Sequence, residues 1–340
     1  MIDINYISKT IDAYANDTDE LRPHFGCSSV GSACERLQWL KFRWAVIPKH
    51  KDRIKRIFRR GHHEEKFAIQ DLEKVGIKVT NNENCLFNYE RIDVNFGSHV
   101  SGSLDGIAYI NNEKYVLEIK THNKKSFKEL TDTNNIRKSH IQHYVQVQLY
   151  MLGSNINKCL YYAVCKDNDE IYTEIVHLNE EIAKSYLEKA KKIALADRPP
   201  DRISEIPSWY VCTMCDAKEF CHSTKLTKEV NCRTCTHSTA TKDGIWHCAK
   251  WNSKIPTVED QKNGCDEHVL HPDLVPWEQV ASDKEWQAVY LIDNRKVKNG
   301  AKVATDVFTS KELVINASAC ADDSLMSLSI KNDFNGVIIS

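Results

Sequence analysis

The chain has 340 residues, with 46 Lys and Arg against 47 Asp and Glu, and a formal net charge of −1. Hydrophobic residues make up 41% of the chain, which is enough for a core. Its apolar runs are shorter than the ~20 residues that a membrane-spanning helix needs, so we expect no membrane association. Residues 1–6 lack the basic and apolar regions of a secretory signal, and we expect a cytoplasmic location.

Helical patterns dominate residues 1–60, with apolar residues at helical spacing over 32–42. Further helices are predicted at 61–76, 137–152 (stopped by Gly153) and 180–196. Strands are predicted at 77–79, 86–89, 100–110, 115–120, 159–165 and 170–177. A cysteine-rich segment follows, and residues 273–340 are expected to form a small α/β or β region. The fold class is therefore α/β.

The pattern with the most chemical content runs from Asp105 to Lys120. Asp105 lies in one β-like run, and Glu118 and Lys120 lie two residues apart on the next, after a short Asn-Asn turn. Alternate strand residues share a face, so antiparallel pairing would bring these side chains together. Two carboxylates and an ammonium can hold a divalent metal, activate water and stabilise charge on a phosphate. The pattern predicts a site for phosphodiester cleavage.

Asp105 and Glu118 are predicted oxygen ligands for Mg²⁺ or Mn²⁺, with the Ile119 carbonyl as an extra ligand. Lys120 is expected to orient or deprotonate the attacking water, or to neutralise the scissile phosphate. A lone Glu-x-Lys pair is usually a solvated strand edge. Here it places two charges on one face of an otherwise apolar strand, which is costly unless they are paired or functional.

The order of elements around this motif resembles the PD-(D/E)XK nuclease superfamily. The resemblance covers about residues 25–225 and is closer to the RecB-type branch, which includes lambda exonuclease-like and CRISPR-associated RecB-like nucleases. It implies a mixed central sheet flanked by helices. It also implies an acid or histidine ligand in the segment Gly61-His62-His63-Glu64-Glu65, where we favour Glu65, with Glu64 and His63 as alternatives. Gln146 and Tyr150 match the Gln-x-x-x-Tyr pattern of this branch and share one helix face.

Seven of the 13 cysteines lie between residues 212 and 265, and such clustering in a cytosolic chain indicates metal binding. In RecB-type nuclease relatives of the CRISPR-associated and AddB kinds, one early and three late cysteines hold a 4Fe–4S cluster. The resemblance assigns that role to Cys34, Cys212, Cys215 and Cys221, with zinc as the alternative and Cys27 as the reserve fourth ligand.

A second set consists of Cys232, Cys235, Cys248 and Cys265, and its spacing predicts a structural Zn²⁺ site. His237, His247 and His268 are alternative ligands for this ion. A single site with spare thiols is the simpler alternative to two metals.

Residues 49–60 form the densest basic run and lead directly into the Gly61 motif, while Lys124, Lys125 and Lys128 follow the Glu-x-Lys strand. This placement favours binding of the DNA backbone without base-specific recognition. Five histidines, at positions 62, 63, 122, 140 and 143, lie around the motifs, and the sequence assigns them no catalytic role.

These features together predict a metal-dependent DNA exonuclease for recombination or DNA processing. The alternatives are an endonuclease of the same fold and an inactive DNA-binding scaffold. We expect a nuclease domain over residues 1–225, a cysteine-rich zinc module over 226–272 and a C-terminal region over 273–340. An annealing protein or a helicase is a candidate partner, and a viral origin, with action in the host cytoplasm, would fit such an enzyme.

Overall fold

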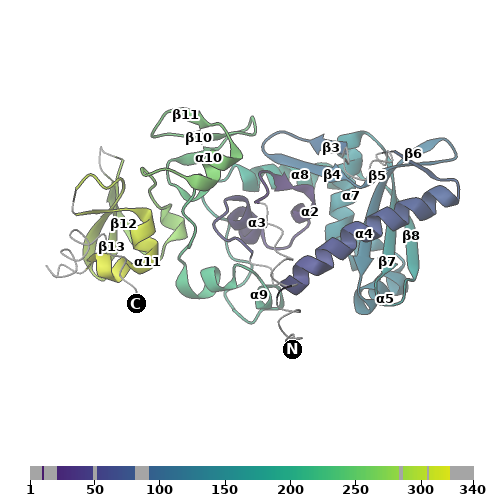
Figure 1. The fold of residues 1–340 in the computed structure, drawn as a ribbon, viewed down its shortest axis with the longest axis horizontal. Coiled ribbons are helices and arrows are strands. Elements are labelled where there is room, and N and C mark those ends of the chain that lie inside the picture. The colour runs from purple at the N-terminus through teal and green to yellow at the C-terminus, as the bar shows by residue number, and fades with distance from the viewer. Residues whose placement is uncertain are drawn as a thin grey trace. The chain divides into compact units, whose positions relative to one another are not determined.

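The structure is a computed structural model that describes residues 10, 21–48, 52–80, 92–282, 286–304 and 306–321. Its contacts divide the chain into two compact units (Figure 1). Unit 1 comprises residues 1–32 and 48–192, and unit 2 comprises residues 33–47 and 193–340. The segments carrying Cys34 and Cys212 therefore belong to one unit. The division into a nuclease domain, a zinc module and a C-terminal region remains a prediction. No helix in the described ranges is long and apolar enough to cross a membrane.

A five-stranded sheet forms the centre of unit 1. Its order is β2-β5-β6-β7-β8, and its strands span Lys78–Thr80, Gly106–Ile110, Glu113–His122, Lys158–Cys165 and Ile171–His177. Within this sheet β6 and β7 run parallel and the other neighbours run antiparallel, so the sheet is mixed, as expected. The predicted strand at 86–89 lies outside the described residues.

The hairpin between β5 and β6 turns through two asparagines. Ile110 pairs with Glu113, and Asn111 and Asn112 between them have φ values of 51° and 65°. Two consecutive left-handed residues are the geometry of the tight hairpin turn whose twist matches that of the strands, and asparagine tolerates it well. The predicted Asn-Asn turn is confirmed, and with it the register of Glu118.

The single strand predicted at 100–110 is wrong, because the chain changes sheets at Asp105. β4 (Val100–Leu104) pairs with β1 (Phe25–Gly26) and β3 (Ile92–Asn95) in a separate three-stranded sheet. β5 begins one residue after Asp105 and joins the central sheet. Asp105 thus lies between two strands, where its carboxylate can accept a hydrogen bond from β6.

Helices pack against both faces of the central sheet. α4 (Asp52–Lys74) buries Ala68, Ile69 and Leu72 against a cluster that includes Leu117 and Ile119 of β6. The alternate residues of β6 face α7 (Ile141–Ser154). The remaining helices of unit 1 are α2 (Cys27–Val30), α5 (Lys124–Thr133), α6 (Ile136–Ser139) and α8 (Glu180–Ala194).

Several helix boundaries differ from the predicted ones. α4 begins nine residues before the predicted start and includes residues 52–60 of the basic run, while α5 was not predicted. The helix predicted at 137–152 is interrupted at His140 and ends at Asn155, which takes the left-handed conformation with φ 56°. Gly153 is not the stop. It lies inside α7, where an added Cβ would come within 2.7 Å of Val94 and Phe96.

Unit 2 contains two small sheets. Strands β9 (Ser238–Ala240), β10 (Trp246–Cys248) and β11 (Ser253–Ile255) form the first, and β12 (Glu278–Ser282), β13 (Ala288–Ile292), β14 (Arg295–Asn299) and β15 (Val307–Phe308) form the second. The helical elements are α3 (Glu35–Phe42), α9 (Tyr210–Thr213), α10 (Val258–Asn263), α11 (Ser310–Ala321) and the short turns η1 (Phe220–Thr224), η2 (Cys232–Thr234) and η3 (Pro272–Leu274). α11 packs on the second sheet, which gives the C-terminal region an α/β character.

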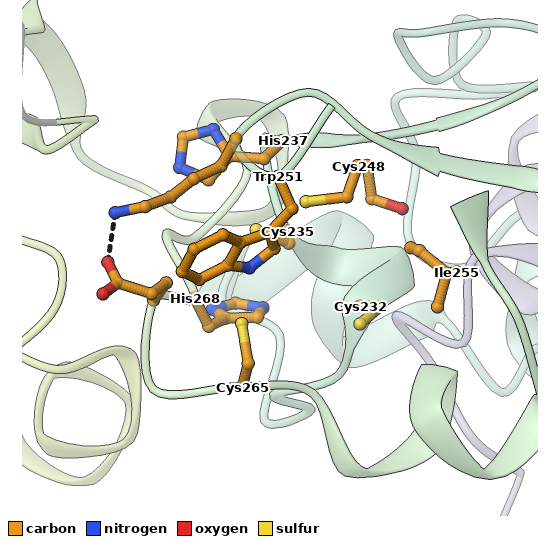
Figure 2. A pocket seen from close by; sticks show the side chains of 11 residues that line it. Cys232, Cys235, His237, Cys248, Trp251, Ile255, Cys265 and His268 are labelled. Atoms are coloured by element: carbon orange, nitrogen blue, oxygen red, sulfur yellow. Dashed lines mark hydrogen bonds and ion pairs between the residues drawn. The ribbon is translucent and has the colours of Figure 1, made fainter. Parts of the chain in front are cut away.

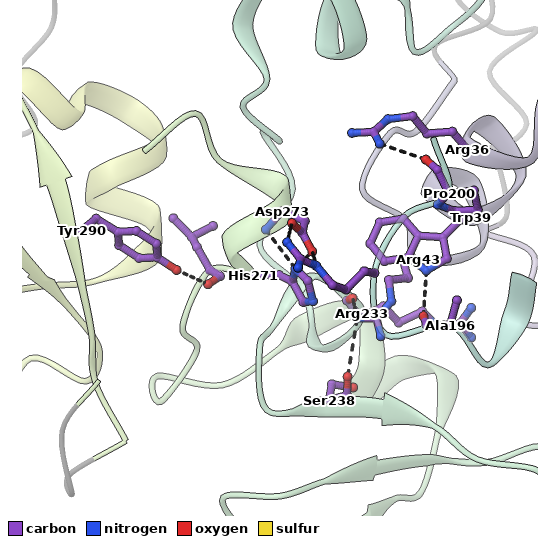
Figure 3. Close-up of polar contacts among 12 residues, drawn as sticks. Arg36, Trp39, Arg43, Ala196, Pro200, Arg233, Ser238, His271, Asp273 and Tyr290 are labelled. Carbon is purple, nitrogen blue, oxygen red and sulfur yellow. Dashed lines mark hydrogen bonds and ion pairs between the residues drawn. The ribbon is translucent and has the colours of Figure 1, made fainter. Parts of the chain in front are cut away.

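Two arginines lie in the core of unit 2 (Figure 3). Arg233 is 1% exposed, and its guanidinium carbon lies 3.6 Å from the centre of the Trp44 ring. Arg43 is 2% exposed, lies 5.0 Å from the Trp39 ring and donates to the Arg233 carbonyl at 3.2 Å. Burial lowers the pKa of Arg43 to about 10 and that of Arg233 to about 9, so both stay charged at neutral pH. This core therefore depends on cation–aromatic stacking as well as on apolar contacts.

Replacing either of two glycines in unit 1 by alanine should change stability, in opposite directions, because one is tightly packed and the other is not. An alanine Cβ at position 102 would lie 2.7 Å from the Tyr150 ring and 3.0 Å from the Cys27 sulfur. Gly102→Ala should therefore cost about 1–3 kcal/mol of unfolding free energy. Gly61 lies inside α4, where an added Cβ would lie 4.0 Å from Thr121 Oγ1. Gly61→Ala should add about 0.5–1 kcal/mol because it restricts the unfolded chain. Urea unfolding measures both, and equal stability of the two variants would contradict the described packing.

Candidate active site and cysteine sites

Glu118, Lys120 and Asp105 come together in unit 1, where the chain enters β5 beside the neighbouring strand β6. Glu118 is fully buried and forms an ion pair with Lys120, a quarter of whose side chain is exposed. The Asp105 carboxylate accepts the backbone N–H of Ile119 at 2.8 Å. That hydrogen bond fixes Asp105 beside the residue that separates Glu118 from Lys120. The sequence prediction that these three residues are neighbours is thus matched by their positions.

The electrostatics of this site are dominated by negative charge. Burial raises the pKa of Glu118 to about 8; Lys120 opposes the shift, and Asp105 and Glu65 add to it. For Lys120, burial by itself would lower the pKa, but the Glu118 and Asp105 carboxylates outweigh it and raise the pKa. Three acidic side chains therefore share the site with one ammonium, and a bound cation would favour the ionised form of all three.

Glu65 is the member of the Gly61 motif that faces this site. It interacts electrostatically with both Glu118 and Lys120, and its carboxylate lies 3.5 Å from His62 Nδ1. Glu64 instead interacts electrostatically with Tyr162, whose side chain lies in the core under α4. His63 is exposed.

Gln146 and Tyr150 contact each other on α7. The Gln146 amide donates to the Tyr150 hydroxyl at 3.1 Å, and both side chains are buried. Burial, with Glu118 nearby, raises the pKa of Tyr150 above its usual range. Tyr150 is thus a neutral phenol. Because its oxygen already accepts from Gln146, its own proton is available for donation to another group.

Cys27 is a neighbour of the site that the sequence did not place there. It is fully buried against Gly102, and burial raises its pKa to about 12, with a contribution from Glu118. It belongs to unit 1, whereas Cys34 belongs to unit 2. Cys27 therefore packs beside the acidic site as a neutral thiol, and the expectation that it is the reserve cluster ligand finds no support in this position.

A hydrogen-bonded chain of three histidines adjoins the acidic site. His143 bonds to the Tyr161 hydroxyl at 2.8 Å, Tyr161 bonds to His122 at 3.1 Å, His122 bonds to the Ser126 hydroxyl at 2.8 Å, and Ser126 bonds to His140 at 2.8 Å. The sequence singled out the histidines but missed Ser126 and Tyr161. No local signal identifies those two residues, because the contacts join four different elements, β6, β7, α5 and α7.

These histidines are neutral at pH 7. Burial lowers the pKa of His122 to about 4, with His140 and Lys120 adding to the shift. Burial likewise lowers the pKa of His143 well below its usual range, and Lys120 and His122 add to that shift. The cluster is therefore a set of neutral hydrogen-bonding rings and gives no positive charge to the site.

Acid should destabilise unit 1 through this cluster. The folded-state pKa values lie below the unfolded value of about 6.5, so the stabilisation is complete above that pH and is lost as the pH falls toward 4. Between pH 7 and pH 5 we expect a loss on the order of 2 kcal/mol per buried histidine. Urea unfolding at the two pH values measures it. His143→Gln should reduce the pH dependence, whereas the exposed control His177→Gln should leave it unchanged.

The Cys34 group consists of Cys34, Cys212, Cys215 and Cys221, which line one small cavity of unit 2 together with Arg36 and Arg202. Cys34 caps α3, where its sulfur accepts the Leu37 N–H at 3.4 Å. Burial raises the pKa of Cys221, while the Arg36 guanidinium, which donates a hydrogen bond to it, lowers that pKa.

The Cys232 group consists of Cys232, Cys235, Cys248 and Cys265, which surround a second cavity of unit 2 (Figure 2). His237 and His268 also line it, but His247 does not. The set predicted from spacing and the set assigned by the family resemblance thus each share one cavity. The twelve cysteines of the described ranges are all free thiols. Within those ranges no set of three His, Cys, Asp or Glu side chains stands in a ready-made coordination geometry.

The predicted basic patch is described in part. Residues 49–51 lie outside the described ranges, and Arg53, Arg59 and Arg60 are exposed on α4. Arg60 donates to the Lys166 carbonyl at 2.7 Å, and Lys128 pairs with Asp132 on α5 at 2.8 Å. The positive charge is thus concentrated in the N-terminal half of α4, on the helix that carries Glu65.

Comparisons with known proteins give only distant similarities. No family model and no curated protein matches the sequence. Among solved structures, LHK-Exo in complex with dAMP is similar at a TM-score of 0.39 and 12% identity, over 55% of this chain and 90% of that one. An alkaline exonuclease (LHK-Exo) from Laribacter hongkongensis has a TM-score of 0.35 and 14% identity over 54% and 90%. SSO0001 has a TM-score of 0.37 and 17% identity over 65% and 96%. Similarity this low decides nothing about function.

Proposed function

We propose that the protein is a metal-dependent deoxyribonuclease of the PD-(D/E)XK, RecB-type kind, and that it acts as an exonuclease on DNA ends. The observation that carries the proposal is the fully buried Glu118 paired with Lys120, with Asp105 held beside them by the Ile119 N–H. A structural ion pair would not need two further carboxylates close to a buried one.

The residues of this site fit a divalent cation. The raised pKa of Glu118 reflects burial and the repulsion of Asp105 and Glu65, which a bound cation would relieve. Asp105, Glu118 and Glu65 are the ligands we assign, with the Ile119 carbonyl as a further oxygen donor. Carboxylate and carbonyl oxygens suit Mg²⁺ or Mn²⁺. When bound, the ion would polarise the scissile phosphate and lower the pKa of a coordinated water.

The protein's own groups position the phosphate. Lys120 is positively charged and its side chain is partly exposed. Its ammonium can therefore contact the phosphate while it stays paired with Glu118. The Tyr150 hydroxyl, oriented by Gln146, is a neutral donor next to the same acids. The basic N-terminal half of α4 would bind the DNA backbone, which carries no sequence information.

Loss of the Lys120 ammonium should reduce cleavage at least about 100-fold, since one preorganised charge donor contributes on this scale. The measurement is digestion of end-labelled linear DNA and covalently closed circular DNA with Mg²⁺, by the intact protein and by Lys120→Ala. The matched control is Lys114→Ala, an exposed lysine on the same strand, which should digest at the wild-type rate.

The two DNA substrates separate the alternatives. Digestion of linear DNA only, lost in Lys120→Ala, supports the exonuclease. Cleavage of circles would make the enzyme an endonuclease of the same fold. Binding of DNA by the wild type without any cleavage would instead favour an inactive scaffold.

For the Cys34 group we propose a 4Fe–4S cluster, with zinc as the alternative. Four free thiols line one cavity, and the donor set fits either group. Arg36 donates to Cys221, and the Leu37 N–H donates to Cys34. These donors stabilise thiolates. The family resemblance selects the cluster over zinc.

Anaerobically purified protein should contain about four iron and four sulfide per chain, as a 4Fe–4S cluster requires. Cys212→Ser should lose both, while Cys320→Ser, a substitution in α11 outside this cavity, should keep both. Iron and sulfide analysis makes the measurement. Zinc in place of iron would select the alternative, and the absence of any metal would refute the site.

A further inference from the structure

The Cys232 group brings four thiols from three separate segments to one cavity. Cys232 begins the turn η2 and Cys235 caps its end, Cys248 ends β10, and Cys265 follows α10 (Figure 2). Four free thiols meeting in a space of this kind are a donor set for a closed, four-coordinate metal site.

The Cys235 sulfur has two backbone hydrogen-bond donors. The backbone N–H groups of Val269 and His237 donate to its sulfur. The turn itself is closed by the Cys235 N–H, which donates to the Cys232 carbonyl at 3.1 Å, and by a capping box between Asn231 and Thr234. A neutral thiol is a weak acceptor, so two N–H groups directed at one sulfur have their full effect only on a thiolate.

The neighbouring histidines are already engaged in other contacts. His268 bonds through Nδ1 to Ser310 at 2.7 Å and through Nε2 to the Asn231 carbonyl at 3.0 Å. His237 bonds through Nε2 to the Trp286 carbonyl at 3.2 Å. The cysteines are therefore the better ligands.

Positive charge lies next to the cavity. Arg233 sits between Cys232 and Cys235 in sequence, and Arg43 interacts electrostatically with Cys235. Both guanidinium groups are buried. Zn²⁺ with four thiolates carries a net charge of about −2, which would attract these buried cations, as Asp197 and Asp273 already do for Arg43.

The surrounding segment is too small to fold around an apolar core alone. Its sheet has three strands of three residues each. Modules of this size generally need a metal or a disulfide for stability, and these cysteines form no disulfide.

We infer that Cys232, Cys235, Cys248 and Cys265 bind one structural Zn²⁺ as four thiolates, and that this ion fixes the turn carrying Arg233 against Trp44 and the Phe42 carbonyl. The thiols rotate into the cavity when they bind the ion. The ion takes no part in catalysis, so this inference does not depend on the proposed nuclease activity.

Zinc content and cobalt substitution test the inference. Wild-type protein should carry one equivalent of zinc that Cys265→Ala lacks and that the control Cys320→Ser keeps. Cys265 is exposed, so its truncation leaves no cavity, and its effect reports on coordination rather than on packing. Cys265→His, which restores a ligand, should regain the equivalent. Co²⁺ added to metal-free protein should give thiolate-to-cobalt charge-transfer bands in wild type and in Cys320→Ser, and weaker bands in Cys265→Ala.

Stability provides the second readout. A strong chelator should lower the thermal midpoint of wild type and of Cys320→Ser, whereas Cys265→Ala should already unfold at a lower temperature and should lose less of its midpoint to the chelator than wild type does, because the Cys34 group is intact in all three. Wild type with no zinc equivalent assignable to these cysteines would overturn the inference. So would iron at this site, or a wild-type midpoint that the chelator leaves unchanged.

Discussion

The fully buried carboxylate of Glu118 is the constraint on which unit 1 is organised. Taking a carboxylate out of water costs several kcal/mol unless it is paired and hydrogen-bonded. Lys120 supplies one positive charge, but Asp105 and Glu65 add negative charge to the same place. A protein selected for stability alone would gain from an apolar residue at position 118. A strained acidic site of this kind is understandable where a cation completes it, because the cation would remove part of the repulsion between the acidic groups.

Strand β6 serves structure and chemistry at once through its alternation. Leu117 and Ile119 face α4 and belong to the apolar core, whereas Glu118, Lys120 and His122 face the side of α7. The core contacts of Leu117 and Ile119 hold the strand in place. They thereby also fix the positions of Glu118, Lys120 and His122 on its other face. Tyr161, which is paired with Glu118 across β7, extends the polar face into the histidine chain. The neutral histidines therefore position the site by hydrogen bonds without adding charge to it.

The parts of this arrangement that the sequence predicts are those with a local signal. The Asn111-Asn112 turn fixes the β5–β6 register, and the spacing of Glu118 and Lys120 places both on one face. The break at Asp105 was missed, because a residue that leaves one sheet for another has the same local pattern as one inside a strand. The roles of Ser126 and Tyr161 were missed for a related reason: their hydrogen bonds are made across elements. Helix α5 does have local signals, the Asn123 cap and a left-handed Asn134 at its end, which the sequence prediction did not use. Spacing grouped Cys232, Cys235, Cys248 and Cys265 as their cavity does, and the family resemblance grouped Cys34 with Cys212, Cys215 and Cys221. Neither gave a sign that Arg43 and Arg233 would be buried.

Those two arginines connect the chemistry of unit 2 with its folding. A buried guanidinium keeps its charge. The guanidinium groups of Arg43 and Arg233 contact aromatic rings, carbonyl oxygens and the Gln261 amide, and Asp197 and Asp273 act electrostatically on Arg43. Arg233 lies inside the Cys232 turn, and Cys235 also acts electrostatically on Arg43. Ionisation of Cys235, which binding of the proposed zinc ion would require, would therefore place negative charge close to Arg43 and favour burial of its guanidinium.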